Sequence, residues 1–303
     1  MLAIKRILCP VDFSEYSRHA LEQAVGLARH HDAAVTVLHV FAVAPVAEVV
    51  PVGAPTALEP VTLPASARAG LERELGRFTA PVHSGGASIA LHVGEGDPVT
   101  TIVEEAEALH ADLIVMGTHG RSGFQRLILG SVAESVLRKV ACPMLTVPPR
   151  ADESTSLTFT RILCAVDFSE ASIHALEYAA NFGPDGPREV YALNVVELMA
   201  GDGAQLRDQL IGDEPDYRTN FKRAAADRLQ TAIPDAVRTR GALRELVTIG
   251  KPANQILHVA AEEDCDLIVM GVRARSASDL LLFGSTTQHV LREARCPVLT
   301  VRA

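Results

Sequence analysis

The residues best suited to chemistry lie in a glycine-bearing stretch between an apolar run and a helical pattern. The run DLIVM (112–116) stops at Gly117, Gly120 follows, and nine residues separate Gly120 from the pair Gly130 and Ser131. N–H groups in the first turn of a helix lack helical partners, the helix dipole is positive there, and glycine admits close approach to the backbone. This order of elements suits the binding of phosphate oxygens. Taken alone, the same glycines are equally compatible with a plain turn.

Polar side chains near this stretch favour binding over covalent chemistry. Ser131 lies at the predicted helix start, where its hydroxyl can donate a hydrogen bond, and no neighbouring base is placed to make it a nucleophile. Arg121 and Arg126 on the intervening loop can add positive charge. Asp12 follows an earlier apolar run, where a single carboxylate can hold a phosphate-bridged metal ion or simply cap the end of a strand. We therefore predict a binding site and assign no catalytic residue.

Other chemical signatures are weak or missing in the sequence. The P-loop pattern GxxxxGK[ST] is absent, and Gly94 and Gly96 lack the rest of a dinucleotide fingerprint. The eleven histidines form no HExxH motif, so no protein metal site is predicted. The five cysteines lie in or beside apolar runs without a CxxC spacing, which favours buried reduced thiols over metal or redox chemistry.

Composition narrows the class of partner. A chain of 303 residues with 48% hydrophobic residues can form about two domains with real cores. The net charge of −9 argues against general binding to nucleic acid, because that requires a basic surface. The first residues, MLAIKRILCPVD, lack the layout of a signal peptide, and no stretch is apolar enough to span a bilayer. We expect a cytoplasmic protein that binds neither nucleic acid nor membranes.

An internal repeat decides the organisation of the chain. Residues 6–24 and 161–179 are identical at fifteen of nineteen positions, at an offset of 155 residues. Residues 112–147 and 266–301 align without a gap at an offset of 154. The sequence therefore predicts one domain in two copies. The first domain is predicted over 1–148, the second over 159–303, and a Pro-rich and polar linker over 149–158.

Strand and helix patterns alternate in both copies. Ser14 and Asp97 occupy N-cap positions of predicted helices, and Pro98 occupies a first turn. The predicted strands cover 6–12, 33–41, 88–96, 112–117, 142–147, 161–167, 189–196, 243–249, 266–271 and 296–301. The predicted helices cover 15–30, 65–80, 98–109, 131–140, 170–181, 216–231, 252–263 and 285–294. Continuous apolar strands between helices indicate a parallel sheet covered on both faces.

The predicted sheet gives the candidate residues a common place. Open sheets of this kind bind ligands beyond the carboxyl ends of their strands, where the strand order reverses. Asp12 and Gly117 both follow predicted strands. If those strands are neighbours, the two residues frame one crevice.

Together, these motifs resemble the universal stress protein family in its tandem two-domain form. The resemblance rests on ILCPVDFSE, DLIVMGTHG, the pattern Gly-x2-Gly-x9-Gly-Ser and the terminal CPMLTV, and it covers essentially the whole chain, twice. It implies an α/β fold of two open-sheet domains, each a five-stranded parallel sheet of order 3-2-1-4-5 with helices on both faces, Rossmann-like and suited to adenine nucleotides. Members with the intact glycine pattern resemble the ATP-binding branch of the family, and members lacking it generally do not bind ATP.

The resemblance also implies roles for single residues. The bound cofactor would be ATP, with Mg²⁺ entering only as Mg-ATP beside Asp12. The adenine and ribose side would be formed by Pro10, Val11 and Asp12, with Val40 packing on adenine. The ribose and phosphates would be lined by Met116, Gly117, His119, Gly120 and Arg121, and the phosphates held by Gly130, Ser131 and Val132.

The second copy departs from the glycine pattern. Its corresponding set is Asp167, Gly271, Arg273, Gly284, Ser285 and Thr286. Ala274 replaces Gly120, and an alanine there obstructs a positive φ or a close phosphate approach at a cost of about 1 kcal/mol or more. Arg273 and Arg275 could compensate through their side chains. We expect this copy to bind ATP weakly, not at all, or to prefer another ligand; drift in a domain kept for structure explains the loss equally well.

The resemblance also predicts a function. We expect a cytoplasmic stress-response protein that binds ATP, chiefly in the first domain, as a sensor or regulatory module. The alternatives are a slow ATP hydrolase or phosphotransfer enzyme, and an ATP-independent interaction scaffold. CPMLTV and CPVLTV should be the last strands of their sheets, and in this family such edge strands pair between domains. We therefore expect an internal pseudo-dimer, with association of two chains into a homodimer.

Overall fold

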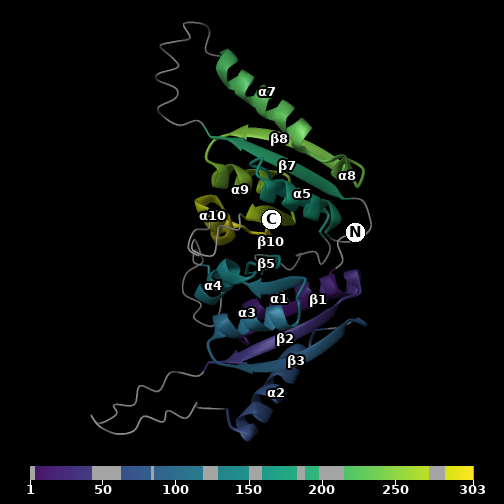
Figure 1. Cartoon of the computed structure of the whole chain (residues 1–303), viewed down its shortest axis with the longest axis vertical. Coiled ribbons are helices and arrows are strands. Elements are labelled where there is room, and N and C mark those ends of the chain that lie inside the picture. Colours follow the sequence, from purple (N-terminus) through teal and green to yellow (C-terminus); the bar gives the residue numbers. More distant parts are fainter. Residues whose placement is uncertain are drawn as a thin grey trace, which may run out of the picture.

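The structure, a computed structural model, shows strands and helices alternating through both copies (Figure 1). It describes residues 4–42, 63–82, 85–118, 129–149, 159–182, 188–197, 215–272 and 284–302. The first copy contains β1 (Arg6–Pro10), α1 (Glu15–His31), β2 (Ala34–Phe41), α2 (Ala65–Thr79), β3 (Ser88–Glu95), α3 (Pro98–Ala108), β4 (Leu113–Gly117), α4 (Ser131–Lys139) and β5 (Met144–Val147). The second contains β6 (Arg161–Ala165), α5 (Glu170–Asn181), β7 (Glu189–Val196), α7 (Pro215–Ala232), α8 (Asp235–Arg238), β8 (Ala242–Ile249), α9 (Pro252–Glu262), β9 (Leu267–Val272), α10 (Ser285–Glu293) and β10 (Val298–Arg302).

The predicted helices and strands are confirmed in type and order, with ends that shift by up to two residues. Ser14 caps α1, because its hydroxyl accepts a hydrogen bond from the N–H of Ser17 at 3.2 Å. Asp97 caps α3 in the same way, accepting from the N–H of Thr100 at 2.9 Å, with Pro98 as the first helical residue. The short helix α8 was not predicted.

All ten described strands form one sheet, in the order β3-β2-β1-β4-β5-β10-β9-β6-β7-β8. Each half has the predicted order 3-2-1-4-5, and its strands are parallel, as in the pairs β1–β4 and β6–β9. The pair β5–β10 is antiparallel and joins the two halves. The two copies thus form a single ten-stranded sheet in place of two separate sheets.

Apolar side chains cover both faces of this sheet. In β1, Ile7 and Cys9 face one cluster and Leu8 faces the other, which is the two-residue alternation of a strand buried on both sides. The helices α1, α2, α5, α7 and α8 pack on the first face, and α3, α4, α9 and α10 pack on the second. This explains why the strands read as continuous apolar runs.

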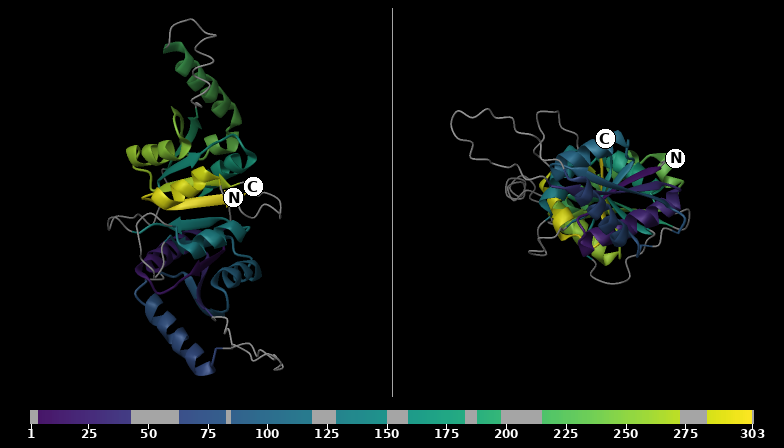
Figure 2. Two further views of the ribbon diagram at one scale, coloured as in Figure 1. Left: turned by 90° about the vertical axis from the view of Figure 1, so that its left-hand side faces the viewer. Right: turned by 90° about the horizontal axis from the view of Figure 1, so that it is seen from below.

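The junction between the copies is a two-fold-like arrangement at the centre of the molecule (Figure 2). Buried Thr146 and Thr300 each donate a side-chain hydrogen bond across the strand pair, to the carbonyls of Val298 (3.0 Å) and Met144 (3.1 Å). Around the sheet, Arg302 donates to the carbonyls of Leu137 and Arg138, and Gln288 donates to Glu134 at 3.1 Å. The predicted internal pairing of the edge strands is confirmed.

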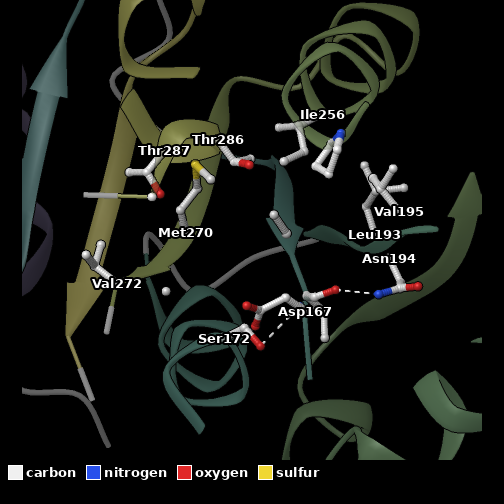
Figure 3. A pocket seen from close by; sticks show the side chains of 15 residues that line it. Asp167, Ser172, Leu193, Asn194, Val195, Ile256, Met270, Val272, Thr286 and Thr287 are labelled. Carbon is white, nitrogen blue, oxygen red and sulfur yellow. Dashed lines mark hydrogen bonds between the residues drawn. The ribbon is translucent and has the colours of Figure 1, made fainter. Parts of the chain in front are cut away.

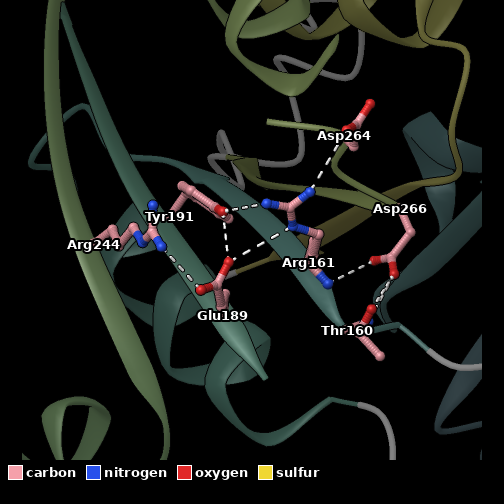
Figure 4. Close-up of polar contacts among 7 residues, drawn as sticks. All are labelled: Thr160, Arg161, Glu189, Tyr191, Arg244, Asp264 and Asp266. Carbon is pink, nitrogen blue, oxygen red and sulfur yellow. Dashed lines mark hydrogen bonds and ion pairs between the residues drawn. The ribbon is translucent and has the colours of Figure 1, made fainter. Parts of the chain in front are cut away.

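A polar network lies at the amino ends of the strands in the second copy (Figure 4). Asp266 accepts hydrogen bonds from the backbone N–H groups of Thr160 (2.8 Å) and Arg161 (3.1 Å). Glu189 accepts from the hydroxyl of Tyr191 at 2.7 Å and from Arg244 at 3.1 Å. The network ties β6, β7 and β8 together and lies away from the carboxyl ends, so it shapes the sheet and not a ligand site.

Candidate functional site

The sheet order places the two predicted strand ends side by side. Ile7 and Leu8 of β1 pair in parallel with Leu113 and Ile114 of β4. β2 lies on the far side of β1, and β5 lies on the far side of β4. The order in which the chain adds strands to the sheet therefore reverses between β1 and β4. This is the switch point at which open α/β sheets hold ligands. The second copy repeats the arrangement with β6 and β9.

A tight turn follows the strand at this edge in each copy. An Oδ1 atom of Asp12 accepts hydrogen bonds from the N–H (3.1 Å) and hydroxyl (2.5 Å) of Ser14. Phe13 between them has a φ of 65°, which is costly for a residue with a side chain. In the second copy Phe168 has a φ of 63°, and the Oδ1 atom of Asp167 accepts hydrogen bonds from the N–H and hydroxyl groups of Ser169. One carboxylate oxygen of each aspartate therefore caps the turn, as the structural interpretation of Asp12 predicted.

The neighbouring strand anchors the same turn with a different side chain in each copy. Nδ1 of His39 lies 2.9 Å from the carbonyl oxygen of Val11, and it donates in the tautomer protonated at Nδ1. The side-chain amide of Asn194 donates to the carbonyl of Val166 at 2.7 Å. The backbone beside each aspartate is thus held by β2 or β7.

The start of α4 lies directly beyond β4. The N–H of Gly130, the N-cap, donates to the carbonyl of Thr118 at 2.6 Å, and Thr118 is held to the carbonyl of Val147 through its own N–H at 2.9 Å. Ser131 is exposed at the first helical position. The structure therefore brings Asp12, Gly117 and Gly130 to one edge of the sheet.

Part of the predicted site lies outside the described residues. In the first copy these residues are His119, Gly120, Arg121 and Arg126. In the second copy they are Arg273, Ala274 and Arg275. The described residues of the predicted site come from the turn after the first strand, the end of the fourth strand and the start of the last helix. In the first copy a fourth segment contributes, because Val40 lies half-buried near the end of β2.

A cavity of about 540 Å³ lies at this edge of the second copy (Figure 3). Its lining includes the counterparts of predicted first-copy residues: Ala165, Val166, Asp167, Val195, Met270, Gly271, Gly284 and Thr286, which correspond to Pro10, Val11, Asp12, Val40, Met116, Gly117, Gly130 and Val132. The positions that the family resemblance implies in the first copy thus line a cavity in the second. Its volume falls in the range of roughly 300–1,000 Å³ that is usual for small-molecule sites.

The cavity is apolar on its walls and polar at two places. Ile256 and Met270 line it beside Val195, and Asp167 is the one ionisable side chain among the described residues that line it. Figure 3 shows Thr286 and Thr287 above Met270, on the side opposite Asp167. Such a surface suits a ligand with an apolar ring and polar groups at both ends.

Gly271 has a structural reason of its own to be glycine. A Cβ atom built there would lie 2.3 Å from the backbone carbonyl oxygen of Ala171, at the start of α5. Helix α5 therefore packs directly on the end of β9, and no side chain fits between them. The first glycine of the pattern serves helix–strand packing in this copy, whether or not a ligand is bound.

Several lining residues were missed from sequence. Thr287, Asn194, Pro252 and Ile256 line the cavity without belonging to the predicted set. The run Ser285-Thr286-Thr287, three hydroxyl residues at a helix start, was a signal for the first of them. The predicted Ser285 is exposed and does not line the cavity.

The fold is that of a doubly wound α/β protein in two fused copies, and a cavity lies at the switch point of the second copy. The model of the universal stress protein family matches residues 3–148 and again 158–302. The chain therefore belongs to the universal stress protein family.

Individual relatives agree with this assignment. A universal stress protein of Methanocaldococcus jannaschii is 36% identical over 143 residues, which are 47% of this chain and 81% of that protein. A universal stress protein of Mycobacterium tuberculosis is 27% identical over 226 residues, covering 74% of this chain and 71% of its own length. The crystal structure of a universal stress protein from Archaeoglobus fulgidus covers 98% of both chains with a TM-score of 0.66 at 22% identity, which supports the fold.

Proposed function

We propose that this stress protein binds ATP, chiefly at the carboxyl edge of β1 and β4, and acts as a sensor or regulatory module. The observation that supports it is the second-copy cavity, because its lining repeats the positions at which the first copy carries Asp12, Met116, Gly117 and Gly130. The first copy also keeps the full glycine pattern in sequence. Free N–H groups at the start of α4 are suited to phosphate oxygens.

The proposed contacts with ATP are divided among the segments of the site. Pro10, Val11, Asp12 and Val40 contact adenine and ribose. The end of β4 and the following residues, Met116, Gly117, His119, Gly120 and Arg121, contact ribose and phosphates. Gly130, Ser131 and Val132 bind phosphates at the start of α4. Mg²⁺, where present, enters with ATP beside Asp12.

Titration of the nucleotide-free chain with ATP tests the proposal. Asp12→Ala should weaken ATP binding by tenfold or more, because the carboxylate is lost and its cap on Ser14 loosens. Asp227→Ala, an exposed aspartate on α7, is the control and should bind ATP as the parent chain does. Matching melting temperatures separate lost binding from lost folding. Absence of ATP binding at millimolar nucleotide would overturn the proposal in favour of an ATP-independent scaffold.

Slow ATP hydrolysis or phosphotransfer is the alternative activity for the same site. Steady turnover well above that of Gly120→Asp and Ser131→Ala variants would establish it. Turnover no higher than in these variants would leave the chain a binding module.

The remaining expectations stay proposals. We propose a cytoplasmic location, domain limits at 1–148 and 159–303, and association of two chains into a homodimer. None of the helices that the structure describes is long and apolar enough to cross a membrane.

A further inference from the structure

Strand β2 holds the backbone of the turn that carries Asp12. The N–H of Val11, the residue before Asp12, donates to the carbonyl of Leu38 at 2.8 Å. Nδ1 of His39, the next residue of β2, lies 2.9 Å from the carbonyl oxygen of Val11. Because a carbonyl oxygen only accepts, Nδ1 carries the proton of this hydrogen bond. Both polar groups of the Val11 backbone are therefore fixed by β2 at the carboxyl edge of the sheet.

The ring of His39 also packs on Phe13, the residue of this turn with a positive φ. The two ring centroids lie 4.2 Å apart, and the ring planes are tilted by 36°. Phe78 of α2 meets Phe13 edge-on, with the centroids 5.6 Å apart. A φ of 65° is unfavourable for phenylalanine and persists only where neighbouring groups hold it. His39 and Phe78 supply two such contacts.

The second copy holds the corresponding turn with other groups. Asn194, the counterpart of His39, donates its side-chain amide to the carbonyl of Val166 at 2.7 Å and also lines the cavity (Figure 3). The hydrogen bond is thus kept, but an amide offers no ring to the phenylalanine. The guanidinium carbon of Arg228 lies instead 4.1 Å from the ring centroid of Phe168. The anchoring hydrogen bond is common to both copies, whereas the histidine ring is particular to the first.

We propose that His39 is a positioning residue for the nucleotide of the first copy. It acts through Val11 and Phe13, because its hydrogen bond and its ring fix the turn in the conformation that presents Asp12 at the edge of the sheet. The role toward a nucleotide rests on the proposed function, whereas the hold on the turn needs no ligand. His39 therefore affects ATP affinity through the shape of the backbone.

Calorimetric titration of the nucleotide-free full chain with ATP compares two variants with the parent. His39→Ala removes the hydrogen bond and the ring, and it should weaken ATP binding about tenfold or more because the turn no longer holds Asp12 in place. His39→Asn installs the second-copy anchor and should bring the affinity back to about threefold below the parent, since only the ring contact is lost. His258→Ala, at an exposed histidine of α9, is the matched control and should bind ATP as the parent does.

Hydrogen exchange of the same proteins without nucleotide tests the hold on the turn. The N–H of Ser14 donates to Asp12, and the N–H of Ser17 donates to the hydroxyl of Ser14. These two amides should exchange faster in His39→Ala than in the parent, and His39→Asn should largely restore their protection. Melting temperatures show whether each variant folds. If His39→Ala does not fold, the threefold loss of affinity in His39→Asn carries the test.

Three results would overturn the inference: equal ATP affinity in folded His39→Ala and the parent, no recovery of affinity in His39→Asn, or unchanged exchange of the Ser14 amide in His39→Ala. Failure of the proposed function looks different, because the parent chain then binds no ATP at millimolar concentration. The role of His39 toward a nucleotide falls with it, while the exchange of the Ser14 amide still shows whether His39 holds the turn.

Discussion

At the carboxyl ends of their strands the two copies share the same backbone frame and differ in several side chains of the candidate site. Both have a strand-end aspartate that caps a serine, a phenylalanine at positive φ and a glycine N-cap on the last helix. The differing pairs are Pro10 and Ala165, His39 and Asn194, Thr118 and Val272, Val132 and Thr286, and Ala133 and Thr287. The comparison teaches that the scaffold of the site persists independently of the glycine loop, so that ligand preference can change without a change of fold.

The glycines of the second copy differ in why the position can be glycine. Gly271 is required by packing on α5, whereas a Cβ atom at Gly284 would meet nothing within 4 Å. The presence of the first glycine in a degenerate copy is therefore no evidence for phosphate binding there. The later glycine has room for a side chain and is the more informative of the two.

The largest expected effect tests this difference. Gly271→Ala should lower the free energy of unfolding by about 3 kcal/mol, because the new methyl group meets backbone that must shift. Gly284→Ala should cost less than about 1 kcal/mol, as for an N-cap glycine with open space. Chemical denaturation of the two variants provides the measurement. Equal losses would show that packing on α5 does not explain the first glycine.

An intermediate effect is expected at the junction, where the copies are alike. Thr146→Val and Thr300→Val should each lower the free energy of unfolding by about 1 kcal/mol, since each removes one buried side-chain hydrogen bond across β5 and β10. Thr231→Val, at an exposed position, should change it by less than about 0.5 kcal/mol. A large difference between the two buried variants in denaturant unfolding would break the two-fold-like symmetry of the junction.

The smallest effect concerns two cysteines at matching positions. Burial raises the pKa of the Cys142 thiol to about 11 and that of Cys296 to about 12. Below either pKa the reactive thiolate is scarcer for Cys296, by about tenfold for one pKa unit. Peptide mass spectrometry after brief alkylation at pH 8 should find Cys142 modified first. Faster modification of Cys296 would contradict the greater burial of the second-copy thiol.

Most of the fold could be predicted because its signals are local or repeated. Continuous apolar runs marked buried strands, caps such as Ser14 and Asp97 marked helix starts, and the duplication showed two equal domains. The helix α8 has four residues, which is too short to show a helical repeat of apolar residues, so the sequence pattern could not predict it. The network of Arg161, Glu189 and Tyr191 depends on the register of neighbouring strands, which their separate sequences do not disclose.

The cavity of the second copy lies where the sequence predicts a site, but only part of its lining was predictable. Strand ends and helix starts indicated the edge of the sheet, and the second-copy lining agrees with that place. Asn194 and Ile256 were missed because an apolar or amide residue in the middle of an element gives no sign of which cavity it borders. Ser285 was included because its type suits phosphate, although the helix directs Thr286 and Thr287 to the cavity instead.

The number of ATP molecules bound per chain tests the account most directly. Equilibrium dialysis of the nucleotide-free full chain should give one equivalent of ATP, abolished or much weakened in Asp12→Ala and retained in Asp167→Ala. This result would place ATP in the first copy and leave the second for another ligand. Two equivalents of equal affinity, or one that Asp167→Ala removes and Asp12→Ala leaves intact, would contradict the division between the copies.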